Sequence, residues 1–134
     1  MNLGTAVAAG LAVVLSVAPA AYAQTGPTTV EIRRTGQEGL TRVMEQAIES
    51  AFAKSPDFTP AEPYQAAKMV VWLTEPAHAT GEGDRIMGRF AVGDDQQVFG
   101  QGGTVCPAAQ LNVCADLVVE RAKRYRRKAE RIAR

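Results

Sequence analysis

The sequence predicts an α+β fold in which two helices pack on a small, antiparallel-rich sheet of three or four strands, in the order β-α-β-β-β-α, with one disulfide bond. Three observations lead to this prediction: short segments that alternate apolar and polar residues, two longer segments with apolar residues at helical spacing, and a single pair of cysteines. The chain has 134 residues, which is a one-domain length.

The first 23 residues predict a signal peptide. Residues 1–23 carry no charged side chain, and an apolar run over residues 6–18 is followed by Pro19 and then Ala21-Tyr22-Ala23, whose small residues suit signal peptidase cleavage. The run is too short for a membrane-spanning helix, which needs about 20 apolar residues, so an uncleaved membrane anchor is the weaker alternative. We therefore expect a single mature domain of residues 24–134, without a transmembrane segment, in the periplasm or outside the cell.

The two cysteines predict a disulfide bond. Cys106 and Cys114 are the only cysteines, and an even number in an exported chain indicates pairing. The closed loop is short, so the bond should contribute about 2–3 kcal/mol in the chain-entropy model. The alternative is a reactive thiol at Cys106 near a helix start, but the only histidine, His78, lies far away in the sequence.

The first strand and the first helix follow a short polar segment, residues 24–27, at the start of the mature chain. Residues 28–34 alternate apolar and polar side chains, which predicts a strand with one solvated face. Thr35 and Glu38 form a capping-box pattern, so we expect a helix to begin there. Its apolar residues recur at helical spacing until Lys54, where Ser55-Pro56 cannot continue the helix.

The middle of the chain predicts a buried strand and a hairpin. A proline-broken connection follows the helix, with a short edge strand expected near Phe58. Residues 67–74 are apolar on both faces and β-rich, which is typical of a central strand. Residues 85–92 and 96–101 flank a Gly-Asp-Asp turn and predict a hairpin. The Gly-Gln-Gly-Gly segment at residues 100–103 should loosen the chain before the first cysteine, and it lacks the residues of a phosphate-binding loop.

The loop at residues 75–84 carries the residues that come closest to a metal site. Glu75, His78, Glu82 and Asp84 occur together, but their spacing matches no standard metal-binding motif. We therefore expect a solvated acidic loop, and no metal or other cofactor. A serine hydrolase is also disfavoured, because the chain has no G-x-S-x-G motif.

The last segment predicts a basic amphipathic helix over residues 111–134. Its apolar stripe consists of Leu111, Cys114, Val118, Ala122, Tyr125, Ala129 and Ile132. Beside this stripe lies a basic stripe formed by Arg121, Arg124, Lys128 and Arg131. It is interpreted either as a solvated helix end or as a surface that binds an anionic partner, such as an envelope protein or lipid headgroups. Nucleic acid is not expected as that partner, because the chain is exported and the cations lack an aromatic stacking set.

This order of elements in an exported chain resembles the small α+β domains of bacterial envelope proteins, such as the N-terminal domain of TolB and the CsgG and LpoB outer-membrane assembly group. The resemblance covers most of the mature chain at the level of topology, and it implies an assembly or auxiliary role in the envelope. Our first hypothesis is therefore a non-enzymatic interaction module that uses the basic helix and a sheet edge. The second is a small-molecule or glycan binder with Trp72 and Phe99 in a groove, and the last is a small hydrolase.

Overall fold

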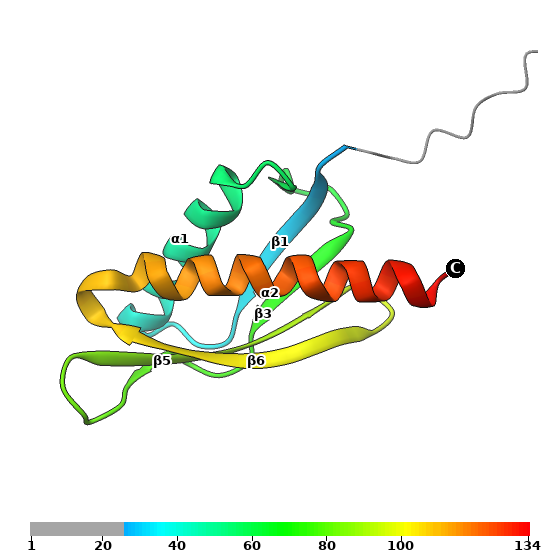
Figure 1. Cartoon of the computed structure of the whole chain (residues 1–134). Coiled ribbons are helices and arrows are strands. Elements are labelled where there is room, and N and C mark those ends of the chain that lie inside the picture. The colour runs from blue at the N-terminus through cyan, green and yellow to red at the C-terminus, as the bar shows by residue number, and fades with distance from the viewer. Residues whose placement is uncertain (1–25) are drawn as a thin grey trace, which may run out of the picture.

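The computed structural model describes residues 26–134, so the predicted signal peptide lies outside the described residues. The predicted α+β class is confirmed: two helices pack with a mixed six-stranded sheet (Figure 1). One disulfide bond is present. The elements are β1 (Thr28–Arg34), α1 (Gly39–Lys54), β2 (Phe58–Pro60), β3 (Met69–Leu73), β4 (His78–Ala79), β5 (Arg85–Gly93), β6 (Val98–Pro107), a 3₁₀ turn (Ala108–Gln110) and α2 (Leu111–Ile132). Strand β2 is the short edge strand expected near Phe58, and β4 is a short strand that was not predicted.

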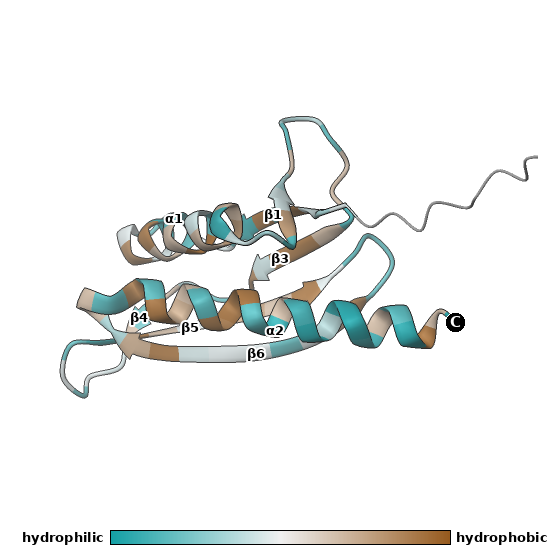
Figure 2. Cartoon of the chain, turned by 45° about the horizontal axis from the view of Figure 1, so that its top comes forward, coloured by the Kyte–Doolittle hydropathy of each residue, from teal (hydrophilic) through white to brown (hydrophobic). Residues whose placement is uncertain are grey.

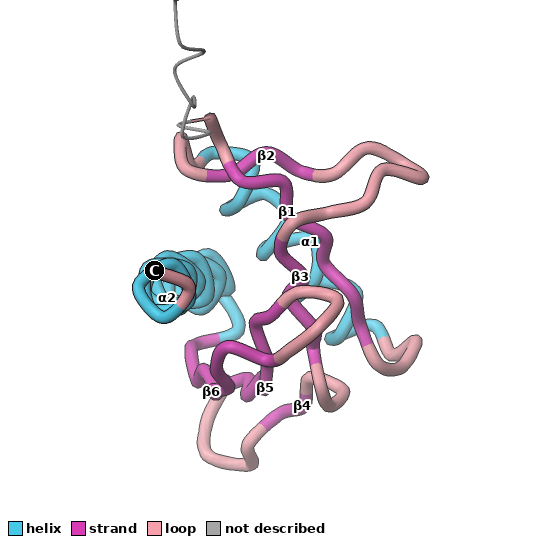
Figure 3. The backbone as a smooth tube through the Cα atoms, turned by 90° about the vertical axis from the view of Figure 1, so that its right-hand side faces the viewer, coloured by secondary structure: helices cyan, strands magenta, loops and turns pink. Residues whose placement is uncertain are grey.

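The sheet combines a parallel half with an antiparallel half. Its order is β2-β1-β3-β5-β4. Strands β3 and β4 pair with different parts of one side of β5, and β6 pairs with the other side along its whole length. Strand β1 is parallel to β2 and β3, because α1 carries the chain back over the sheet before the next strands begin. Strand β5 is antiparallel to β3, β4 and β6, and with β6 it forms the predicted hairpin. Figure 3 looks along α2 and shows these strands in succession around that helix.

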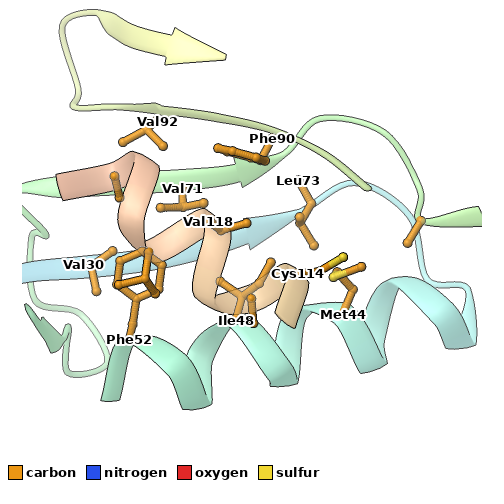
Figure 4. Close-up of a cluster of buried hydrophobic side chains, with 14 of the residues drawn as sticks. Val30, Met44, Ile48, Phe52, Val71, Leu73, Phe90, Val92, Cys114 and Val118 are labelled. Carbon is orange, nitrogen blue, oxygen red and sulfur yellow. The ribbon is translucent and has the colours of Figure 1, made fainter. Parts of the chain in front are cut away.

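Both helices cover the same face of the sheet, and the hydrophobic core lies between them and the strands (Figure 4). Helix α1 points Met44, Ile48 and Phe52 toward this core, at the helical spacing that the sequence predicts. Strand β3 faces them with Val71 and Leu73. Complete burial of side chains of this size contributes about 1.5–3 kcal/mol each, so this layer supplies much of the stability.

The predicted capping box at the start of α1 is wrong. Thr35 directly follows β1 and is held at the sheet, because its N–H donates to the Leu73 carbonyl at 3.1 Å. Gly36 then turns the chain with φ 94°, a conformation that favours glycine. The helix starts only at Gly39, and no side chain caps it.

Strand β6 is longer than predicted and carries α2 close against it. The glycines expected to loosen the chain lie inside the strand, where Gly100 pairs with Val92 and Gly102 with Phe90. Neither glycine leaves room for a Cβ, because the Tyr125 ring lies over Gly100 and the Arg121 guanidinium over Gly102. These glycines therefore set the distance between β6 and α2.

Candidate docking surface

The exposed side of α2 carries cations without acidic partners. Arg124, Arg127, Lys128 and Arg131 are exposed, and their spacing of three, four and seven residues puts them on one side of the helix. The buried residues of α2, such as Val118 and Ala122, lie on the opposite side. Among residues 26–134, no acidic side chain forms an ion pair with any of these four cations. Figure 2 shows the C-terminal half of α2 as mostly hydrophilic.

Arg121, the first member of the predicted basic stripe, is placed differently from the other three. Its Nη1 donates to the Gly103 carbonyl at 3.1 Å, and its guanidinium lies 5.7 Å from the centre of the Phe90 ring. A side chain at this position leans toward β6, where the glycines leave space for it. Arg121 is therefore used within the fold, whereas Arg124, Lys128 and Arg131 remain on the surface.

Two further basic residues of α2 attach the helix to the β1–β2 edge. Lys123 Nζ lies 2.9 Å from the Glu120 carboxylate and 3.4 Å from that of Asp57. The hydrogen bond to Glu120 is the main cause that raises the pKa of Lys123. Arg126 Nη1 donates to Thr28 Oγ1 at 2.9 Å and to the Asp57 carbonyl at 3.3 Å. The sequence gives no sign of this division between attached and free cations.

The same exposed side of α2 becomes apolar toward its N-terminus. Val113 and Leu117 are each 43% exposed. They precede Arg124 and Lys128 by multiples of a helical turn, so the apolar and basic residues form one continuous line. This apolar extension was not predicted, although the spacing of the residues is visible in the sequence.

The disulfide bond fixes the start of α2. Cys106 at the end of β6 is linked to Cys114 in the first turns of the helix, with their Cα atoms 5.8 Å apart. This bond confirms the predicted disulfide, and both cysteines are buried in the core. The described residues contain no free cysteine.

The other residues considered from the sequence do not meet in one site. Trp72 lies between the core residues Val71 and Leu73 and so faces away from the helices, whereas Phe99 packs against the core on the α2 side. His78 is exposed, with Nδ1 3.3 Å from the Pro76 carbonyl. Within residues 26–134, no three His, Cys, Asp or Glu side chains are grouped so that they could hold a metal ion.

Two further findings complete the description. Neither described helix combines the length and the apolar character that crossing a membrane requires. No protein-family model matches the chain, and no curated protein sequence matches it either.

Proposed function

We propose that the protein is an exported, non-enzymatic interaction module of the cell envelope, which docks onto anionic lipid headgroups through the exposed side of α2. The docking residues are Arg124, Arg127, Lys128 and Arg131, with Val113 and Leu117 beside them. The observation that carries the proposal is the set of four exposed cations that lack acidic partners and face away from the core. The disulfide bond supports a location outside the reducing cytoplasm.

Simple electrostatics gives the expected strength of this docking. A cation close to an anionic membrane contributes about 1 kcal/mol, so the four together would supply about 4 kcal/mol. This energy corresponds to a roughly thousandfold increase in affinity. The attraction is screened over about 10 Å at 0.1 M salt, so the binding should weaken steeply as salt is added. The exposed apolar residues would add contact area at the headgroup boundary.

The test is co-sedimentation with vesicles of phosphatidylglycerol and phosphatidylethanolamine, compared with vesicles of phosphatidylcholine alone. The variant Arg124→Glu/Lys128→Glu should lose binding, because it reverses the centre of the basic surface. The control Arg42→Glu/Lys54→Glu makes the same change in net charge at exposed positions of α1. The control should bind nearly as well as the unaltered protein, and the far-UV circular dichroism of all three proteins should coincide.

Two results would contradict the proposal. Equal loss of binding in both double variants would show that net charge alone matters. Absence of binding to the anionic vesicles at low salt, together with capture of an acidic envelope protein that the α2 variant no longer captures, would replace the lipid surface with a protein one.

A further inference from the structure

Strand β1 has one side that is only partly paired. Strand β2 pairs with the beginning of β1, and the last pair in this register is Val30 with Pro60. The chain then leaves the sheet, since Pro60 ends β2 and the Ala61 N–H makes the last bond, to the Val30 carbonyl at 2.8 Å. From Glu31 to Arg34, β1 is paired on its other side only, with β3.

The backbone of Ile32 points into this open edge. The Thr28 N–H donates to the Asp57 carbonyl and the Val30 carbonyl accepts from Ala61, so these even-numbered residues face the β2 side. Thr35 faces β3, because its N–H donates to the Leu73 carbonyl. Backbone groups alternate along a strand, so the N–H and C=O of Ile32 face the β2 side beyond the end of β2.

The long strand β6, at the opposite side of the sheet, is protected in a way that β1 is not. The Tyr125 hydroxyl donates to the Gln101 carbonyl at 3.0 Å, and Arg121 donates to the Gly103 carbonyl. Both donors come from α2 and occupy acceptors along the free side of β6. Proteins commonly cover or block a long free strand, because it is a template for another strand. Among the described residues, no comparable side-chain donor reaches the open part of β1.

A groove of about 500 Å³ runs beside the open edge, between β1 and α1. Its accessible apolar lining comes from Ile32, Ala53 and Pro60, with the buried side chains of Val30 and Phe52 beneath them. Its polar wall includes carboxylates of two kinds, and the difference between them decides what the groove can bind.

One carboxylate of this wall is free. Glu31, the other carboxylate of the groove wall, is paired with Arg33 at 2.9 Å. Glu49 lines the groove and has no hydrogen-bonding or ionic partner among the described residues. Desolvation by the groove wall raises the pKa of Glu49, the nearby Glu45 raises it further, and Arg34 opposes both. A cation beside Glu49 would stabilise the ionised carboxylate, which desolvation and Glu45 disfavour.

We propose that this edge binds an extended peptide segment of a partner protein, which adds to the sheet as a strand beside residues Glu31–Arg34. Its backbone pairs with Ile32, its apolar side chains lie on the groove, and a lysine or arginine reaches Glu49. Backbone pairing supplies affinity in such complexes, and alternate side chains supply specificity. This proposal does not depend on lipid docking through α2.

The test uses the purified protein and the probe peptide acetyl-Thr-Val-Thr-Lys-Thr-Val-Thr-amide, whose valines and lysine share one face of a strand. Amide exchange measured by nuclear magnetic resonance should slow at least tenfold at Ile32 when the peptide is saturating. The variant Glu49→Lys should lower the affinity for the peptide at least tenfold. The control Glu82→Lys, which makes the same charge change on the exposed β4–β5 loop, should change the affinity less than twofold. A peptide with glutamate in place of lysine should bind at least tenfold more weakly.

Three outcomes would overturn the proposal. The first is that the peptide does not bind to the unaltered protein. The second is binding that leaves the exchange of the Ile32 amide unchanged, which would place the peptide elsewhere. The third is an equal effect of Glu49→Lys and Glu82→Lys, which would reduce the interaction to net charge. Far-UV circular dichroism and thermal unfolding of both variants will separate loss of binding from loss of folding.

Discussion

The close contact between β6 and α2 should make Gly100→Ala one of the most damaging small substitutions in the protein. A Cβ at Gly100 would lie 2.7 Å from Tyr125 Cδ1 and closer still to two other atoms of the ring. The ring cannot yield easily, because its hydroxyl is bonded to the Gln101 carbonyl and its body packs against the core. The substitution therefore forces α2 away from β6 or expels the ring.

The magnitude follows from these two contacts. Overpacking of a filled site costs about 1–3 kcal/mol. Loss of the tyrosine hydrogen bond adds about 1 kcal/mol. We therefore expect Gly100→Ala to lower the free energy of unfolding by about 2–4 kcal/mol.

The strand offers two graded controls for this substitution. A Cβ at Gly103 meets only the Gly88 carbonyl at 3.6 Å and Arg89 Cγ at 3.9 Å, which are ordinary contacts. Gly103→Ala should therefore be neutral or stabilising by up to about 1 kcal/mol, because alanine loses less backbone freedom on folding. Gly102→Ala should fall between the two, since it meets the flexible end of Arg121.

Equilibrium urea unfolding measures these differences, with the fluorescence of the single tryptophan, Trp72 in β3, as one probe and circular dichroism as the other. The decisive comparison is Gly100→Ala in a Tyr125→Ala background. If the ring is the cause, the penalty of Gly100→Ala should fall to about zero there, because double-mutant cycles isolate the interaction between contacting residues. A full penalty in that background, or equal effects at Gly100 and Gly103, would refute the reasoning.

Four other predictions address the core, the disulfide, the attached cations and export. Phe52→Ala should cost about 3–5 kcal/mol in urea unfolding, because its completely buried ring leaves a cavity. Reduction of the disulfide should cost about 2–3 kcal/mol and lower the Tm by several degrees in a thermal scan, whereas an unchanged Tm would argue against its structural role. Arg126→Ala should lower the unfolding free energy by about 1–2 kcal/mol through lost hydrogen bonds, while exposed Arg124→Ala should stay within about 0.5 kcal/mol. The intact mass of the secreted protein should begin at Gln24, and retention of residue 1 in the membrane fraction would contradict export.

The main elements could be predicted because their signals are local. The spacing of Ile48 and Phe52 defines the core face of α1, and the apolar run around Val71 defines the central strand. The start of α1 was mispredicted because a long-range backbone bond ties Thr35 to β3, and a local capping pattern contains no information about that bond. Strand β4 has two residues, which is too short for any alternation to be visible.

The candidate surface was only half predictable, for a related reason. Arg121 and Arg124 are alike in the sequence, and only the glycines of β6 decide which of them turns inward. The open edge of β1 depends on the place where β2 stops, which the proline at position 60 signals only once β2 is known to pair there.

The charges of α2 show how one basic helix can hold the fold together and still present a free surface. On one flank of its buried stripe, Arg121 occupies a carbonyl of β6; on the other, Arg126 occupies acceptors at the start of β1 and β2. Each of these cations is fixed by its hydrogen bonds to the strands or to the residue before β2. Arg124 and Lys128, on the far side, form no hydrogen bond or ion pair with any described residue, so the packing of the fold does not require their charge. Cations that the fold does not need are therefore the ones on which selection for a partner can act, and substitutions there should change binding before they change stability.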